Sequence, residues 1–224
     1  MDFGKLVEEQ IALRERVMEL ARFDEQRALI HGELAHRIKN IFSVISSLLV
    51  VSSRTETDLD GFVRSVTGRI QALSKANDFI INAGPDSDGS ASGLAGLIDA
   101  LLAPFKRDER QVIFSCPSVS VGGKTAAALA LVIHELATNS AKYGALSSVD
   151  GHIDLQCRCD GDAFKITWRE VDGPPVAGIP TRKGFGTRMV ARTVEAQLMG
   201  TIERWFMRDG LVVLLTIPIA VMSR

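Results

Sequence analysis

The residues best suited to chemistry lie in a helical stretch near position 36, which reads Glu-Leu-Ala-His-Arg-Ile-Lys-Asn from Glu33 to Asn40. Its apolar residues follow the three-and-four spacing of an amphipathic helix: Leu34, Ile38, Ile41, Ile45 and Leu48. At about 100° per residue, His36 lies opposite this stripe, whereas His31 falls within it. The periodicity therefore predicts one solvent-facing histidine, flanked by the cations Arg37 and Lys39.

An exposed imidazole between cations allows three interpretations: a polar surface residue, a general base, or an acceptor of a phosphoryl group. Neutral imidazole is a nucleophile near neutral pH. For an isolated exposed histidine the surface interpretation is the commonest. The rest of the chain has to decide between the three.

A second group of polar residues ends the helix predicted over Lys124–Tyr143. This helix is almost wholly apolar up to Ile133, and then one polar stripe begins: His134, Glu135, Thr138, Asn139 and Lys142. A solvated helix end would explain such a stripe. However, a carboxylate and an amide oxygen one turn apart suit a hard cation that keeps most of its waters, and a lysine one turn further can meet a phosphate. The composition therefore favours binding of a magnesium nucleotide.

A third feature is the run Gly184-Phe185-Gly186-Thr187, which leads into a predicted helix from about Thr187 to Met199. Backbone amides at a helix N-terminus form an anion site when glycine leaves them accessible. Two glycines alone are common before helices and indicate little. The preceding Pro/Gly-rich loop, Asp172–Lys183, could cover a ligand.

A fourth feature is Trp168-Arg169-Glu170, at the end of a predicted strand. A carboxylate in this position can accept a hydrogen bond from an exocyclic amine such as that of adenine. Acidic residues at strand ends usually face water, so this feature gains meaning only from the others.

The first part of the chain predicts a helical hairpin. Residues 3–30 are dense in Glu and Arg, with apolar residues near heptad spacing, and a second helix is expected from Leu59 to Ile80. Two helices joined by a short turn form an antiparallel pair. A second copy would complete a four-helix dimer; a monomer with the hairpin folded onto the rest of the chain stays open.

The second part of the chain predicts an α+β sandwich with helices on one face of a sheet. The best domain boundary is the polar, breaker-rich linker Gly84–Gly93. We expect a charged helix (1–30), a hairpin (31–83), the linker (84–93) and a final domain (94–224). In that domain we expect helices over 94–105, 124–143 and 187–199, and strands over 111–115, 151–159, 163–168, 201–207 and 211–217.

Composition excludes several classes of protein. The net charge is −1 over 224 residues, so we expect neither nucleic-acid binding nor attraction to anionic membranes. The apolar runs are too short or too polar to span a bilayer, and no leader is recognisable at the start. Core packing is the expected role of Cys157 and Cys159. The chain is typical of a cytoplasmic protein in a reducing compartment.

Taken together and in this order, these features resemble a histidine kinase of the HWE type. The run His36-Arg37-Ile38-Lys39-Asn40 resembles its phosphoacceptor box, residues 134–144 (HELATNSAKYG) resemble its N-box, and Trp168-x-Glu170 is similar to its tryptophan motif. The resemblance implies a dimerising helical hairpin followed by a GHKL-type two-layer α+β sandwich that binds ATP and Mg²⁺. It also implies that His36 is the phosphoacceptor.

The resemblance assigns roles to individual residues. Glu135 and Asn139 would hold or orient Mg²⁺, Lys142 would meet the phosphates, and Glu170 would read adenine. The general base would be Glu135 or His134, or none would be needed. The remaining nucleotide-binding residues implied by the resemblance are Tyr143, Asp172, Gly173, Gly184, Phe185, Gly186, Thr187 and Thr216.

The chain departs from the family pattern at three positions. Asp172 and Pro174 stand where glycines are expected after the adenine-reading acid, and Arg37 stands where many histidine kinases carry an acidic base. The first two put the nucleotide pose in question.

The resemblance implies autophosphorylation of His36 from Mg-ATP, followed by transfer to an aspartate in the receiver domain of a response regulator. It implies a homodimer through residues 31–83, and an input from an upstream sensor protein or from a longer chain. One alternative is a non-catalytic phosphotransfer hub whose ATP site has decayed. Another is a GHKL ATPase or anti-sigma-type serine kinase, which would not explain the hairpin or the outward His36.

Overall fold

The structure, a computed structural model, describes most of the chain after residue 58. The chain forms two compact units, Met1–Val51 and Ser52–Arg224. His36, its neighbours Arg37 to Asn40, and most of the predicted linker lie outside the described residues. The described residues are 59–82, 93–176, 178 and 184–223, with Arg14, Arg16, Met18, Phe42, Ile45, Ser46 and Leu49.

A five-stranded sheet forms the centre of the second unit. The strands are β1 (Val112–Ser115), β2 (His152–Asp160), β3 (Ala163–Val171), β4 (Thr201–Met207) and β5 (Gly210–Pro218). Their order in the sheet is β1-β2-β3-β5-β4; β1 runs parallel to β2, and the other pairs are antiparallel. The predicted hairpin turn between β2 and β3 is present, with Gly161 at φ 58°, a backbone conformation that favours glycine.

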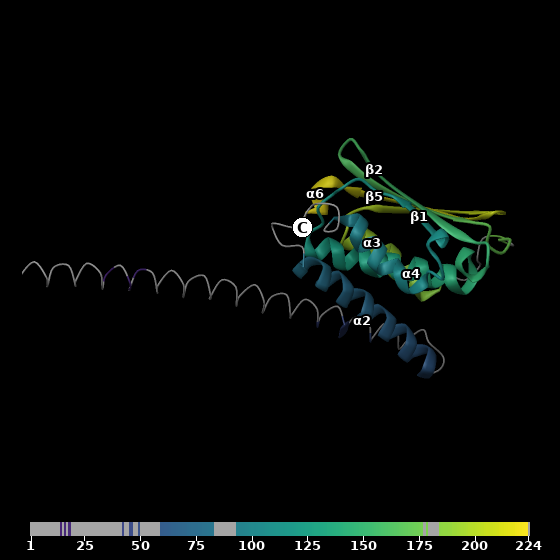
Figure 1. The fold of residues 1–224 in the computed structure, drawn as a ribbon, viewed down its shortest axis with the longest axis horizontal. Helices are drawn as coiled ribbons and strands as arrows, with labels where there is room; N and C mark the ends of the chain where they lie inside the picture. Colours follow the sequence, from purple (N-terminus) through teal and green to yellow (C-terminus); the bar gives the residue numbers. More distant parts are fainter. Residues whose placement is uncertain are drawn as a thin grey trace, which may run out of the picture. The chain divides into compact units, whose positions relative to one another are not determined.

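Helices cover one face of this sheet, as Figure 1 shows for α3 and α4. The three main helices of this layer are α3 (Leu94–Leu102), α4 (Gly123–Tyr143) and α5 (Phe185–Ala196). Alternate residues of β3 are buried against them, namely Phe164, Ile166 and Trp168. The predicted two-layer α+β sandwich is therefore confirmed. Shorter elements are α6 (Ile219–Met222) and the 3₁₀ turns Ala103–Phe105, Glu109–Gln111 and Ala145–Ser147.

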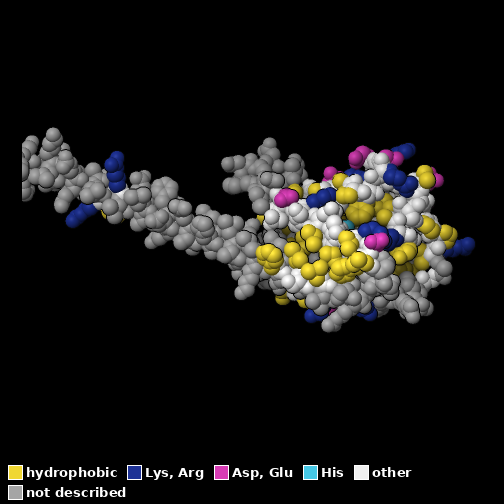
Figure 2. Space-filling model, turned by 90° about the horizontal axis from the view of Figure 1, so that it is seen from below, with side chains coloured by type: hydrophobic (Ala, Val, Ile, Leu, Met, Phe, Trp, Pro, Cys, Tyr) yellow, Lys and Arg dark blue, Asp and Glu magenta, His cyan; other side chains and the backbone are white. Residues whose placement is uncertain are grey.

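Helix α2 (Leu59–Asn82) lies on the side of α4 away from the sheet (Figure 1). Ala72 and Ala76 are buried one turn apart, because small side chains allow close approach of the two helices. The opposite side of α2 carries exposed apolar residues, Leu59, Val63 and Ile70. Figure 2, viewed from this side, shows a band of hydrophobic side chains. Since α2 belongs to the same compact unit as the sandwich, the division at residues 51 and 52 does not coincide with the predicted linker.

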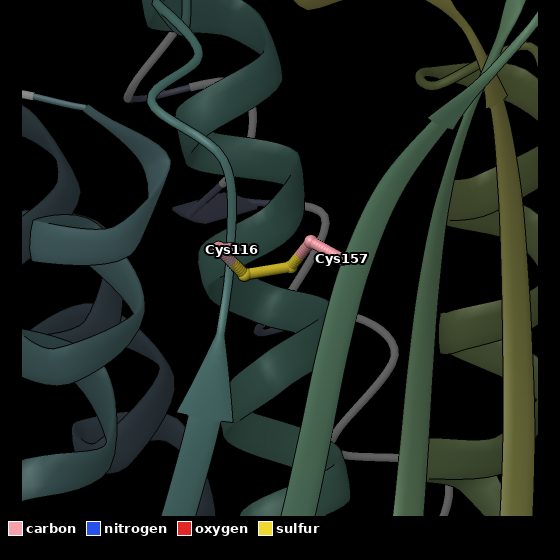
Figure 3. The surroundings of a disulfide bond; sticks show 2 residues. All are labelled: Cys116 and Cys157. Carbon is pink, nitrogen blue, oxygen red and sulfur yellow. A yellow bond between two sulfur atoms is a disulfide. The ribbon is translucent and has the colours of Figure 1, made fainter.

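A disulfide joins Cys116, directly after β1, to Cys157 in β2 (Figure 3). The parallel register pairs Ser115 with Gln156. The residue that follows each of them, Cys116 and Cys157, therefore lies opposite the other, with Cα atoms 4.5 Å apart. The expectation of core packing is confirmed for Cys157, which is buried in the core and also bonded to Cys116, and is wrong for Cys159, which is free and exposed. Burial along β2 ends at Cys157, and sequence spacing alone did not reveal a partner 41 residues away.

Among the described residues, no helix is long and apolar enough to cross a membrane.

Candidate functional site

The polar stripe of α4 begins where α2 crosses it. The Arg69 Nε on α2 donates to Oε1 of Glu135 at 2.7 Å, over a sequence separation of 66 residues. The two side chains are only 5% and 7% exposed. A buried carboxylate needs a charged or hydrogen-bonding partner, and here the partner comes from the neighbouring helix.

His134 lies beside this ion pair. Its ring packs edge-on against Phe105, with ring centroids 5.6 Å apart, and Nε2 is 3.5 Å from Oγ1 of Thr138. A Cβ placed on Gly68 of α2 would lie 2.8 Å from Nε2 of His134. Glycine at position 68 therefore lets the imidazole contact the α2 backbone closely.

The surroundings of His134 favour a neutral ring. Burial lowers the pKa of His134, the nearby Glu135 carboxylate acts against this, and the cations Arg69, Lys75 and Lys142 add to it. A neutral imidazole can accept a proton, but this ring is half-buried and packs against Gly68 and Phe105.

The turn that opens α5 also reaches Glu135. Gly184 is the N-cap residue, and its carbonyl accepts from Arg188 N at 3.4 Å. A Cβ placed on Gly186 would overlap the second carboxylate oxygen, Oε2, of Glu135. Since α5 starts at Phe185, two residues before the predicted start, Gly186 lies within its first turn. The structure thus brings the predicted cation-binding carboxylate and the predicted anion-binding turn into contact.

Glu170 forms a second, separate centre at the end of β3. Its Oε2 accepts from Ala145 N at 2.9 Å, and its Oε1 accepts from Trp168 Nε1 at 3.3 Å. Burial raises the pKa of Glu170, and hydrogen bonds from Ala145, Trp168 and Ser140 oppose the rise. The carboxylate has about four lone-pair directions, so these three donors leave acceptor capacity for one more.

Glycines allow the segments around Glu170 to approach. A Cβ on Gly144 would overlap the Glu170 carboxylate, and one on Gly173 would lie 2.8 Å from the backbone N and Cα of Ala145. The segment after β3 therefore lies against the C-terminal end of α4, as a shared site requires.

Asp172, the first departure from the family pattern, has φ 55°. The position requires the left-handed conformation that glycine adopts freely, and aspartate tolerates it better than most residues. The side chain is exposed, and its Oδ2 lies 3.9 Å from Nδ1 of His152, too far for a hydrogen bond. The substitution therefore keeps the local backbone conformation.

Of the other predicted residues, three lie on α4 and one lies on β5. Asn139 is half-buried one turn beyond Glu135, while Lys142 and Tyr143 are exposed at the end of α4. Thr216 is not brought to either centre. It pairs with Lys165 in the sheet, and its neighbours Leu215 and Ile217, not Thr216, face the helices.

Sequence reasoning missed Arg69 and Gly68 because α2 was treated only as half of a hairpin. A usable signal existed: Arg69, Ala72 and Ala76 recur with helical spacing on one face that is otherwise apolar or small. An arginine within such a face indicates a buried anionic partner.

The donor set fits a magnesium nucleotide. No group of three or more His, Cys, Asp or Glu side chains suited to a metal occurs in the part of the chain that the structure describes. Magnesium in phosphate-transfer sites typically takes one or two protein ligands and completes its shell with water and substrate phosphates. The Glu135 carboxylate and the Asn139 amide supply ligands of that kind.

Comparison with known proteins identifies similar chains. Residues 33–118 match the family model of HWE histidine kinases. Blue-light-activated histidine kinase 1 of Erythrobacter litoralis is 35% identical over 207 residues, which cover 91% of this chain and 56% of that protein. Blue-light-activated histidine kinase of Rhizobium johnstonii is 32% identical over 207 residues, covering 92% and 57%. The chain thus spans little more than half the length of these relatives.

A solved structure has a similar fold. The histidine kinase domain of a blue-light activated histidine kinase from Erythrobacter litoralis superposes with a TM-score of 0.57. The match covers 83% of this chain and 96% of that domain. At 19% sequence identity it shows that the two folds are alike.

Proposed function

We propose that this chain is an ATP-dependent protein-histidine kinase of two-component signalling, because residues 33–118 match the family model of HWE histidine kinases and a histidine kinase is 35% identical over 207 residues. It transfers the γ-phosphoryl group of ATP to His36 and then to an aspartate in the receiver domain of a response regulator. One observation supports this most: Glu135, on the magnesium-type stripe of α4, contacts Gly186 in the anion-binding turn of α5.

In the proposed reaction, a ring nitrogen of His36 attacks the γ-phosphorus while the bond to the β,γ-bridging oxygen breaks and ADP leaves. The positive ring then loses the proton of its other nitrogen. In the second transfer a carboxylate oxygen of the regulator attacks the phosphorus, the phosphorus–nitrogen bond breaks, and the ring takes up a proton again so that it leaves as neutral imidazole. Because little proton removal is needed before attack, positioning and charge neutralisation provide most of the catalysis.

The residues of the two centres have distinct roles in this proposal. Glu135 and Asn139 would hold Mg²⁺, which when bound neutralises charge on the β- and γ-phosphates. Lys142 and the turn from Gly184 to Thr187 would bind phosphate oxygens. Glu170 and the segment Asp172-Gly173 would face the adenine. The assignments of Tyr143, Phe185 and Thr216 depend on the family resemblance alone.

The general base is not His134 in this proposal, since its ring is enclosed between Gly68 and Phe105. Glu135 is a better candidate only after it separates from Arg69.

We also propose a homodimer through residues 31–83, supported by the exposed Leu59, Val63 and Ile70 on α2. The upstream input would come from a sensor that is a separate protein or part of a longer chain. A cytoplasmic location would follow from the use of ATP.

The test is incubation with γ-³²P-labelled ATP and Mg²⁺. The wild-type chain should become labelled, and His36→Ala should not. His31→Ala is the matched control, because His31 lies in the same predicted helix but within the apolar stripe; it should label normally. Label retained by His36→Ala would contradict the proposal.

The alternative of a phosphotransfer hub follows from Asp172 and Pro174 at glycine positions. Titration with Mg-ATP separates the two functions. A kinase should bind at or below millimolar nucleotide, and a hub should not bind.

A further inference from the structure

Two consecutive residues of α2 match two consecutive residues of α4. Gly68 faces the ring of His134, and Arg69 pairs with Glu135. The small residue meets the large ring, where both residues are half-buried, and the cation meets the carboxylate, where both side chains are buried. This contact therefore determines which surface of α2 docks on α4.

The same carboxylate touches a third element. While Oε1 of Glu135 accepts from Arg69, Oε2 lies against Gly186 in the first turn of α5. Glu135 is thus the residue at which the second helix of the hairpin meets the turn assigned to the phosphates.

A guanidinium and a divalent cation compete for one carboxylate. With Arg69 Nε at 2.7 Å from Oε1, a metal ion on Glu135 would place two cationic groups within a few ångströms of each other. Their repulsion is strong where water is excluded, because the effective dielectric constant is low. Docking of Arg69 and loading of metal on Glu135 therefore oppose each other.

We propose that Arg69 is a positioning residue that couples the hairpin to the nucleotide site: its ion pair holds Glu135 away from the metal, and Mg-nucleotide binding breaks this pair and loosens α2 from α4. This inference rests on the proposed function, since it takes Glu135 as a magnesium ligand. The coupling acts in both directions by thermodynamic linkage.

The contacts of α2 indicate which half is released. Lys75 Nζ donates to the carbonyl of Ala100 on α3 at 3.0 Å, and Ala76 is almost fully buried. In the first half of α2, Leu59 and Val63 are exposed and Val66 is buried, and the ion pair between Arg69 and Glu135 attaches this half to α4. We expect that breaking the ion pair loosens residues 59–69, while the half of α2 that carries Lys75 and Ala76 stays docked.

The first test is the affinity of the full chain for Mg-ADP, measured by calorimetry. Arg69→Gln should bind about fivefold more tightly than wild type or better, a typical size for coupling between sites. Arg69→Lys should lie between them, because it keeps the charge and loses the Nε donor. Arg64→Gln, which removes an exposed arginine from the same helix, should match wild type. The gain should vanish when EDTA removes Mg²⁺.

The second test needs no substitution. Adding Mg-ADP to the wild-type chain should speed amide hydrogen exchange in residues 59–69 and leave residues 73–82 nearly unchanged. A purely structural ion pair would not respond to nucleotide in this way.

Three results would overturn the inference. The first is that Arg69→Gln binds Mg-ADP no more tightly than wild type does. The second is that its higher affinity for ADP persists without Mg²⁺. The third is that the rate of amide hydrogen exchange in residues 59–69 does not change when Mg-ADP is added. In each case, normal Mg-ADP binding by wild type would leave the proposed function intact. If neither wild type nor Arg69→Gln binds Mg-ADP at millimolar concentration, both the inference and the proposed function fail.

Discussion

Two buried carboxylates in this chain are neutralised in different ways. Glu135 on α4 and Glu170 on β3 are 5% and 6% exposed. Glu135 is paired with a guanidinium that comes from another helix, α2. Glu170 accepts from a backbone amide and an indole N–H within the sandwich itself.

The difference in partners implies a difference in behaviour. Hydrogen bonds from Ala145 and Trp168 are fixed by the packing of the sandwich, so the environment of Glu170 is built in. The cation beside Glu135 is carried by α2, so its environment depends on where that helix lies. The fixed donors around Glu170 suit a site that always binds the same base, adenine. The cation beside Glu135 suits a site that responds to the position of another helix.

The largest expected effect comes from breaking the ion pair. Arg69→Leu leaves the Glu135 carboxylate buried without its cation, and such a loss typically costs about 3–5 kcal/mol. Adding Glu135→Leu should restore most of this, because two apolar side chains replace two charges. Urea unfolding of the singles and the double variant measures the coupling.

An exposed pair provides the control for that experiment. Lys165 and Asp160 form an ion pair at the surface of the sheet, and Lys165→Leu should cost much less stability than Arg69→Leu, because water screens an exposed pair. If Arg69→Leu and Lys165→Leu lowered the free energy of unfolding equally, the buried ion pair would be no more important for stability than the exposed one.

The next effect tests how tightly Glu170 is enclosed. Gly144→Ala places a methyl group on the Glu170 carboxylate, which overpacks a buried site and should cost about 2–3 kcal/mol. Gly184→Ala is the matched control, since nothing lies within 4 Å of its Cβ position and its φ is −58°. Thermal or urea unfolding that showed the same cost for both would argue against a crowded carboxylate.

A smaller effect is the pH dependence from Glu170. Burial raises the pKa of Glu170, so the folded chain holds this proton more tightly than the unfolded chain does. The tighter binding of this proton stabilises the folded chain fully when the pH is below 4.5, the ordinary pKa of a glutamate. This stabilisation is lost as the pH rises through the pKa of Glu170 in the folded chain. The stability difference between wild type and Glu170→Gln should therefore fall as pH rises from 4.5. A difference that rises instead would mean that the hydrogen bonds outweigh burial.

The smallest effect is expected from His134, and it has the opposite sign. Burial lowers the pKa of His134 below 6.5, so its contribution to stability is present above pH 6.5 and is lost as pH falls through the folded pKa. The groups that face the ring are Glu135, Arg69, Lys75 and Lys142. Wild type should lose more stability than His134→Asn between pH 7 and 5. Parallel pH curves would exclude a buried, neutral ring.

Most of the sandwich was predictable because periodicity and turn residues determine its elements locally. The predicted helix over 124–143 is α4 within one residue, and the strand over 201–207 is β4. The two-layer arrangement followed from alternating strands and amphipathic helices. The parallel pairing of β1 with β2 was not predicted, since it joins strands that are separated in the chain by α4.

The residues of the site could be predicted from the sequence, but the side chains that they contact could not. The sequence singled out Glu135 and Glu170 as carboxylates with a role, yet it gave no means of pairing Glu135 with Arg69, 66 residues away. The role of Gly144 was also hidden, because a glycine at a helix end usually serves as a cap. Thr216 was placed by analogy, and strand alternation turns it away from the helices.

The comparison between the two carboxylates is tested most directly by nucleotide affinity. Dissociation constants for ADP and GDP, with and without Mg²⁺, would be measured for wild type, Glu135→Gln and Glu170→Gln. We predict that Glu135→Gln loses the enhancement by Mg²⁺ and keeps the preference for adenine, whereas Glu170→Gln does the reverse. Loss of both properties to the same extent in both variants would contradict separate roles for the two residues.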